Sequence, residues 1–363
     1  MRTPIAFLLL LLAAACSDDP AGPPGGDTPS GAIVLNGVGA VGVTIVPDTG
    51  STFTHIDITG PFDGAFMTVR GDSVLTATSV AAGDLLYVLD VGARTVRALQ
   101  LPASSNPSGS AFLPGVSVSG THEYAVALRN ARTIARVTLP ATGAAQVTQL
   151  SGAGRCPYDV AFAQGALWSA DANLACESDY APQGAGRLIR VPLTGTARDT
   201  IPLGAAVQSP TRVIVVGGFA YVLASGGAAT PAAIAKVDLG TRSVVATLPF
   251  SQGAFGVNMS LGRDGVLYAI AANEFAPYTT RAYSVDPATL AFRGPFFGAT
   301  SRRLLTLPGG GQAACAAASA DAAGRVYCVE NGETQATLRV FEANGAFVRS
   351  VAAGSLGFDI SVR

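Results

Sequence analysis

An alternating strand, a small turn and a second alternating strand recur seven times along the chain, and this repeat constrains the fold more than any other feature. The clearest copies are LYVLDVGARTVRALQLP from Leu86 and IAKVDLGTRSVVATLPF from Ile234. Two further short strands precede most copies, as in VIVVGG and FAYVLAS from Val213. Successive copies are 43, 48, 54, 46, 48 and 55 residues apart, measured at Pro47, Asp90, Thr138, Pro192, Asp238, Asp286 and Phe341. The sequence therefore predicts seven similar units of four strands each.

Four strands in about 50 residues, repeated seven times, resemble an all-β, seven-bladed β-propeller of the YVTN or YncE-like kind. The resemblance covers residues 32–363 and implies four-stranded antiparallel blades. Too few residues precede Pro47 or follow Phe341 to complete a blade at either end. We therefore expect residues 357–363 to form the inner strand of a shared last blade and residues 32–60 to supply its other three strands, which pairs both terminal edges. The alternative is a six-bladed ring with residues 32–60 as an additional N-terminal ribbon.

The repeat also explains a glycine pattern near the start of this region. Gly37, Gly39 and Gly42 match the spacing of a dinucleotide-binding fingerprint. Such a site requires a helix after the third glycine, so that its N-terminal amides hold the pyrophosphate. Here Val-Thr-Ile-Val-Pro follows, which is typical of a strand. The pattern is interpreted as a glycine-rich turn, and no nucleotide cofactor is expected.

The N-terminus carries a targeting pattern: Arg2, an apolar stretch at residues 5–12, and Ala-Ala-Ala-Cys at residues 13–16. It resembles a bacterial lipoprotein signal peptide. The resemblance implies cleavage after residue 15, acylation of Cys16 and attachment to a membrane through the lipid. Ser17 favours the outer membrane of the cell envelope. The alternative is an ordinary signal peptide with an incidental cysteine. The predicted organisation is a signal peptide (1–15), a lipidated cysteine with a Pro/Gly-rich flexible linker (16–31), and the propeller (32–363).

Four cysteines remain after Cys16, an even number that suits an exported protein. Cys156 and Cys176 flank one predicted hairpin turn, and Cys315 and Cys328 flank another. In each pair the cysteines are about equally far from the turn, so we expect disulfides 156–176 and 315–328. A metal site is the alternative, but the chain has only two histidines and neither is near a cysteine in sequence.

Composition limits the classes of partner. The formal net charge is -1 and no block of like charge occurs, so nothing in the sequence favours binding to a nucleic-acid backbone. We expect a monomer whose partners are the membrane, through the anchor, and a protein, glycan or small ligand.

Loop lengths indicate which face of the ring binds. The long connections are residues 103–115, 171–186, 272–280 and 299–312, and all are assigned to one face. The inner strands begin on that face, and several carry a polar residue there: Asp159, Arg212, Asn258 and Asp359. These four side chains are expected to meet at the mouth of the central channel, where they would hold a small polar ligand or one divalent cation, or would simply contact water.

The connection at residues 171–186 adds Asp171, Glu177, Asp179 and Tyr180 beside Cys176. It is predicted to be either an acidic recognition loop stiffened by its disulfide or a solvated loop that needs the disulfide for order. Phe275, Tyr278, Arg302 and Arg303, in other long loops, add aromatic and charged groups that favour interfaces.

Recognisable catalytic patterns are missing from the sequence. There is no Gly-x-Ser-x-Gly elbow, and neither His55 nor His122 has an evident catalytic partner. The sequence therefore favours a non-enzymatic binding or scaffold module that uses the long-loop face. The alternative is a metal-assisted lactonase or a lyase-like enzyme with carboxylates at the channel mouth.

Overall fold

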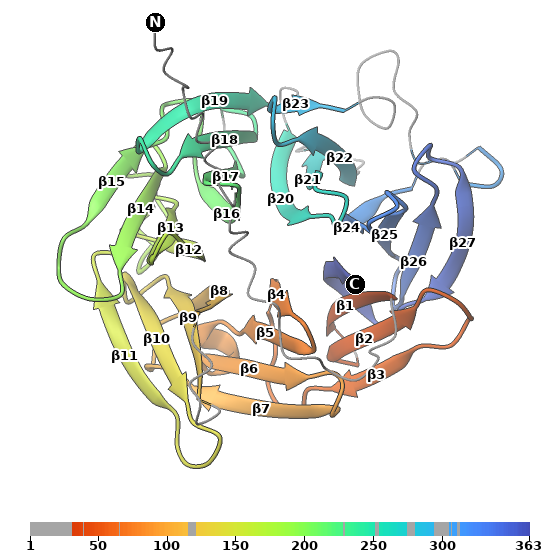
Figure 1. The fold of residues 1–363 in the computed structure, drawn as a ribbon, viewed down its shortest axis with the longest axis horizontal. Helices are drawn as coiled ribbons and strands as arrows, with labels where there is room; N and C mark the ends of the chain where they lie inside the picture. Colours follow the sequence, from red (N-terminus) through yellow and green to blue (C-terminus); the bar gives the residue numbers. More distant parts are fainter. Residues whose placement is uncertain are drawn as a thin grey trace, which may run out of the picture.

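The computed structural model describes residues 31–38, 40–64, 66–114, 121–227, 229–250, 254–273, 280–293, 305, 307–310 and 313–363. These residues form seven four-stranded antiparallel sheets arranged around a ring (Figure 1). The predicted all-β, seven-bladed propeller is therefore confirmed.

The blades are named here in chain order, and the strands of each are given from the centre of the ring outward. The closing blade contains β28 (Leu356–Val362), β1 (Gly31–Val38), β2 (Gly42–Pro47) and β3 (Thr54–Asp57). Blade 1 contains β4 (Met67–Arg70), β5 (Ser73–Ala77), β6 (Leu85–Asp90) and β7 (Thr95–Gln100), with the short 3-10 helix η1 (Val80–Ala82) between β5 and β6. Blade 2 contains β8 (Pro107–Phe112), β9 (His122–Leu128), β10 (Thr133–Leu139) and β11 (Gln146–Ser151).

The remaining blades follow the same order. Blade 3 contains β12 (Pro157–Ala163), β13 (Ala166–Asp171), β14 (Arg187–Pro192) and β15 (Asp199–Pro202). Blade 4 contains β16 (Pro210–Val216), β17 (Phe219–Ala224), β18 (Ala233–Asp238) and β19 (Ser243–Pro249). Blade 5 contains β20 (Ala254–Leu261), β21 (Leu267–Asn273), β22 (Thr280–Asp286) and β23 (Ala291–Phe292), and blade 6 contains β24 (Cys315–Ala320), β25 (Val326–Asn331), β26 (Ala336–Phe341) and β27 (Phe347–Ala352).

The two ends of the described chain close the ring, as predicted. β28 pairs antiparallel with β1, with Ala32 opposite Val362. The buried Asn36 side chain reinforces the junction, because its Nδ2 donates to the carbonyls of Ala353 (2.8 Å) and Ser355 (2.7 Å). The alternative of six blades plus an N-terminal ribbon is therefore wrong, and the two terminal strands pair with each other.

The glycine pattern near the start of the propeller belongs to a hairpin. β1 is followed by β2, which begins at Gly42, so a strand and not a helix follows the third glycine. At Gly37 a Cβ atom would overlap the ring of Phe358 in the neighbouring inner strand. Close packing between strands therefore accounts for this glycine.

The hydrophobic core lies between adjacent blades. Alternating strand residues send side chains to both sides of each sheet, so every blade packs against two neighbours. Trp168 of blade 3, which is fully buried, belongs to the same cluster as Val213 and Val222 of blade 4. Tyr221 of blade 4 also contacts blade 5, because its Oη donates to the Pro287 carbonyl at 2.6 Å.

Within the described ranges, no helix has the length and apolar character needed to cross a bilayer.

One face of the ring carries the connections between second and third strands and the connections between blades; it is called the long-loop face. The prediction that residues 103–115 form one of its long loops is wrong. β8, the inner strand of blade 2, lies within that range. Gly109 lies in β8 so close to Asp159 that a Cβ would overlap the carboxylate, which accounts for the glycine at this position of the strand.

Candidate functional site

Four predicted polar residues converge at the centre of the ring, and they are called the channel cluster: Asp159, Arg212, Asn258 and Asp359. Asp159, Arg212 and Asn258 each follow a register shift near the start of their inner strand, at Pro157/Asp159, Pro210/Arg212 and Gly256/Asn258. Such an irregularity redirects a side chain and leaves nearby amides unpaired in the ladder. The four residues are only 2–8% exposed. Their convergence was expected, whereas their burial was not.

Arg212 is the hub of the channel cluster. Its Nη2 lies 3.0 Å from Asp359 Oδ2, and its Nη1 lies 3.6 Å from Asp159 Oδ2. The guanidinium also lies over the Phe66 ring, 4.7 Å from the ring centroid. Asn258 donates from Nδ2 to Asp359 Oδ1 at 2.9 Å. One guanidinium therefore connects inner strands of blades 3 and 4 with the closing blade, and it reaches a residue that precedes blade 1.

Both carboxylates also bind backbone amides in the same pattern. Asp159 accepts from Val160 N in its own strand and from Val213 N in blade 4, both at 2.9 Å. Asp359 accepts from Ile360 N in its own strand and from Met67 N in blade 1, again at 2.9 Å. Each aspartate therefore ties its inner strand to the inner strand of the next blade.

Burial dominates the electrostatics of these two acids. It raises the pKa of Asp159 to about 6, although Arg212 and the two amides pull in the opposite direction. Burial likewise raises the pKa of Asp359 above its usual range, against the same guanidinium. Two ionised carboxylates facing one guanidinium would leave a net charge of -1 among buried side chains. Uptake of one proton by this pair of carboxylates, as the pH falls towards 6, removes that charge.

The donor set does not fit the divalent cation that the sequence allowed at this position. Arg212 already supplies a positive charge to both carboxylates, and each carboxylate also accepts two amide hydrogens. A divalent ion at the carboxylates would be placed against the guanidinium. In the described part of the chain, no group of three or more His, Cys, Asp or Glu side chains is arranged to hold a metal.

A second polar assembly fixes the connection at residues 172–186. Asp171, at the end of β13, is completely buried. Its Oδ1 accepts from Cys156 N (2.8 Å) and Asn173 N (3.1 Å), and its Oδ2 accepts from Arg187 Nε (2.7 Å). The Asp171 carboxylate therefore holds both ends of this loop and does not face solvent.

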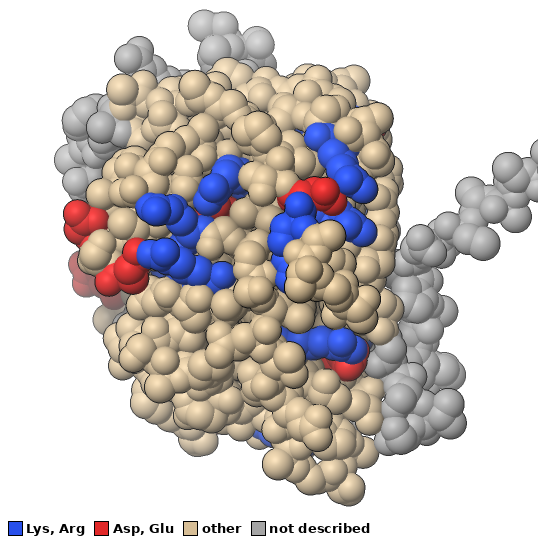
Figure 2. All heavy atoms as spheres, turned by 90° about the vertical axis from the view of Figure 1, so that its left-hand side faces the viewer, with Lys and Arg blue, Asp and Glu red and all other residues tan. Residues whose placement is uncertain are grey.

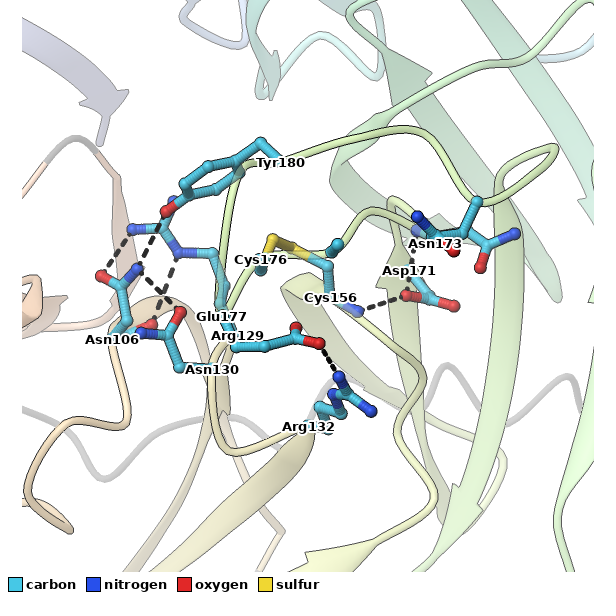
Figure 3. Close-up of a disulfide and its surroundings, with 12 residues drawn as sticks. Asn106, Arg129, Asn130, Arg132, Cys156, Asp171, Asn173, Cys176, Glu177 and Tyr180 are labelled. Atoms are coloured by element: carbon cyan, nitrogen blue, oxygen red, sulfur yellow. Dashed lines mark hydrogen bonds and ion pairs between the residues drawn. A yellow bond between two sulfur atoms is a disulfide. The ribbon is translucent and has the colours of Figure 1, made fainter.

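Both predicted disulfides are confirmed, with Cα atoms 5.6 Å apart for Cys156–Cys176 and 5.3 Å apart for Cys315–Cys328. The symmetry about a hairpin turn is only approximate, because Cys176 lies beyond the end of β13 and pins the loop itself (Figure 3). Two disulfides are typical of proteins that fold in an oxidising, extracytoplasmic compartment.

The other predicted residues of this loop lie near its tip. Glu177 forms an ion pair with Arg132, in the turn between β9 and β10. Asp179 is exposed and accepts from Ala181 N at 3.0 Å, and this hydrogen bond lowers the pKa of its carboxyl. Tyr180 is 41% exposed, and its Oη accepts from Asn106 Nδ2 at 3.2 Å.

Three residues that sequence reasoning missed complete this corner: Asn106, Arg129 and Tyr158. Arg129 donates from Nη2 to Asn106 Oδ1 at 2.9 Å, and its guanidinium lies over the Tyr158 ring, 4.8 Å from the centroid. Figure 3 shows Tyr180, Arg129 and Asn106 together on one side of the disulfide. Their proximity depends on three separate blade connections, so no local pattern marked them.

Cys16, Phe275, Tyr278, Arg302 and Arg303 lie outside the described residues.

Positive charge gathers elsewhere, on the flank formed by blades 2 to 4, with acidic side chains among the basic ones (Figure 2). Arg190 and Arg242 share Asp199, at 3.3 and 3.1 Å. Arg136 binds Glu123 at 2.8 Å. These contacts are ordinary surface ion pairs, which contribute little individually.

Comparisons with solved structures support a propeller fold over nearly the whole chain. A protein from Lactobacillus plantarum aligns with a TM-score of 0.63 and 12% identity, covering 91% of this chain and 98% of its own. A putative 6-phosphogluconolactonase from Bacteroides fragilis aligns at 0.59 and 12% (94% and 99% covered), and the periplasmic gluconolactonase of Pseudomonas aeruginosa at 0.57 and 16% (92% and 99%). No family model and no curated protein sequence matches the chain. At these identities the similarity establishes the β-propeller architecture alone.

Proposed function

We propose that this protein is an extracytoplasmic, non-enzymatic binding module of the bacterial cell envelope, anchored through a lipid on Cys16 and engaging its ligand with the long-loop face. The targeting pattern at residues 1–16 supports the anchor and, through Ser17, an outer-membrane address. The flexible segment that follows would let the propeller orient freely on the membrane. The YVTN or YncE-like resemblance is consistent with this role, and the expected acting unit is a monomer.

The observation that carries the proposal is the internal fixation of the long-loop face. Buried Asp171 and the disulfide hold residues 172–186. Buried Asp84 does the same for the connection between blades 1 and 2, because it accepts from Ser104 N and Asn106 N, each at 2.7 Å. Loops that are ordered before binding lose little conformational entropy on binding. A rigid face that presents an exposed tyrosine suits recognition.

In-cell photo-crosslinking tests this proposal in the natural host. A photoreactive residue at exposed Ser178, in the loop of blade 3, should capture a ligand of the envelope. The matched control places the same residue at exposed Thr241, in the turn between β18 and β19 on the opposite face. Adducts at position 178 and none at 241 support the proposal. Equal adducts at both positions, or none at 178, would contradict it.

A lactonase-like or lyase-like enzyme at the channel mouth is the alternative. Two solved structures with a similar fold are described as a putative 6-phosphogluconolactonase and a gluconolactonase, and the raised pKa of Asp159 is a property that acid–base groups share. The geometry supports it less, because both carboxylates of the channel cluster are buried and already bound. Lactone hydrolysis by the full-length protein, lost in Asp159→Asn and retained in Asp199→Asn, whose partly buried carboxylate belongs to a surface ion pair away from the channel, would favour the enzyme.

A further inference from the structure

Backbone strain concentrates at one corner of the long-loop face. Asp84, Ser104, Asn106 and Tyr180 all have left-handed φ values, between +52° and +59°. Asp84 binds the amides of Ser104 and Asn106, and the Asn106 side chain binds Tyr180 Oη, so the four residues form one connected assembly. Strained residues that their surroundings hold in place cluster at functional sites. The strain at Tyr180 is notable because a bulky aromatic residue rarely adopts this conformation.

The side chains at this corner form a polar and aromatic surface, called the tyrosine–arginine strip: Asn106, Arg129, Asn130, Tyr158 and Tyr180. Asn106 is 4% exposed, and its side chain binds three other residues of the strip. Its Nδ2 donates to Asn130 Oδ1 and to Tyr180 Oη, each at 3.2 Å, while its Oδ1 accepts from Arg129. The Tyr180 hydroxyl accepts this bond and therefore keeps its own hydrogen for a ligand. Arg129 uses Nε and Nη2, which leaves Nη1 without a hydrogen-bond partner among the described residues.

The strip has little apolar area and a net positive charge. Its exposed apolar groups are the Tyr180 ring and the adjoining Val80, which is 44% exposed and donates its amide to Asn106 Oδ1 at 3.4 Å. Arg129 is the only charged side chain of the strip itself. Nearby, Arg132 and Glu177 pair with each other, and the carboxylates of Asp84 and Asp179 accept backbone amide hydrogens. A stable protein interface buries about 800 Å² on each partner around an apolar core. One exposed ring beside several hydrogen-bond donors better matches a compact ligand with an apolar face, hydroxyl groups and negative charge.

We propose that the tyrosine–arginine strip binds an acidic saccharide, with a sugar ring over Tyr180 and an anionic substituent on Arg129. The ring C–H groups are attracted to the negative face of the aromatic ring, and a carboxylate or phosphate accepts the free N–H groups of Arg129. Hydroxyl groups then bind the Tyr180 hydroxyl and the Asn130 amide. The inference rests on the proposed function, because it specifies the ligand of the same face.

An oligosaccharide array tests this with the full-length protein in detergent. The array carries oligouronates, sialylated, sulfated and phosphorylated oligosaccharides, and uncharged glucans of matched length. We expect binding to acidic members. Tyr180→Ala should weaken binding about tenfold or more, while Arg129→Gln should remove the preference for acidic over uncharged sugars. The matched control is Phe53→Ala, since Phe53 is 40% exposed on the opposite face. Unchanged urea midpoints would verify that the variants fold.

Two results would overturn the inference. One is the absence of binding to every saccharide while crosslinking at position 178 persists, which rejects the sugar and keeps the binding module. The other is saccharide binding that Tyr180→Ala and Arg129→Gln leave intact, which places the sugar elsewhere. Absence of crosslinking at position 178 would contradict the proposed function itself. The failure of the saccharide inference can therefore be told apart from the failure of the proposed function. A protein adduct at 178 with no saccharide binding would identify a protein ligand instead.

Discussion

Replacing Arg212 by methionine should destabilise the propeller strongly and in a pH-dependent way. Methionine keeps an apolar side chain over Phe66 but leaves Asp159 and Asp359 buried without their counter-charge. Removing one partner of a buried ion pair typically costs about 3–5 kcal/mol. The full cost applies only where both carboxyls are ionised. We therefore expect a loss of about 3–5 kcal/mol at pH 8 and less than half of that at pH 5.

The sign of this pH dependence follows from the folded-state pKa. The pKa of Asp159 rises from 3.8 to about 6 on folding, so between these values the folded protein binds more protons than the unfolded chain. The contribution of this group is thus fully present below about pH 4 and declines as pH rises through 6, by about 3 kcal/mol in total. Without Arg212 the carboxyl pKa rises further, so the decline should extend to higher pH in the methionine variant.

Urea unfolding with intact disulfides, at pH 5 and at pH 8, measures both quantities. Arg212→Lys keeps the charge and should recover most of the stability at pH 8. Arg242→Met is the matched control, because Arg242 is half exposed and pairs with Asp199 at the surface; it should cost less than about 1 kcal/mol at both pH values. Equal losses for Arg212→Met at the two pH values, or a loss below about 1 kcal/mol at pH 8, would refute the account of the channel cluster.

Three further changes test other parts of the structure by urea unfolding. Lys236→Met should cost about 2–3 kcal/mol, because Nζ donates to two carbonyls of the next blade at 2.7 Å and lies over Phe219; a loss near zero would count against this inter-blade contact. Replacing Cys156 and Cys176 together by serine should cost about 3 kcal/mol for a separation of 20 residues, and an unchanged midpoint would contradict the role of this disulfide. Gly109→Ala should cost more than about 2 kcal/mol, because the new Cβ would overlap the Asp159 carboxylate. The double variant with Asp159→Ala should lose less stability than the two single variants lose in sum. Strictly additive losses would rule out that contact.

The fold was predictable from the sequence because each blade repeats the same alternation and the same turns. The period placed β28 in the closing blade even though it lies far from β1 in sequence. β8 was missed for a physical reason: its inner position demands small residues where it approaches Asp159, so Pro107–Phe112 lacks the usual pattern of large apolar side chains. A strand specified by a tertiary contact carries little local pattern.

The candidate site was predictable only in part. Inner strands start at one face, so the meeting of Asp159, Arg212 and Asp359 followed from topology. Which atoms pair, and that one guanidinium would lie between both acids in a buried position, depends on distances across the ring that no sequence pattern encodes. Asn106 and Arg129 were missed for the same reason. Each is an unremarkable polar residue in a turn, and only the side-by-side placement of separate blades makes them neighbours.

Amide hydrogen exchange of the unliganded protein tests the central claim, a long-loop face that is ordered before it binds, most directly. The amides of Ala172, Ala175, Tyr180 and Gln183 donate to carbonyls within the loop or beside it, at 2.9–3.0 Å, and Asn106 N binds buried Asp84. These five amides should exchange far more slowly than in an unstructured peptide, with protection that falls at Ala172 and Tyr180 when the Cys156–Cys176 disulfide is removed. Exchange at unstructured rates in the native, oxidised protein would contradict a preorganised binding face.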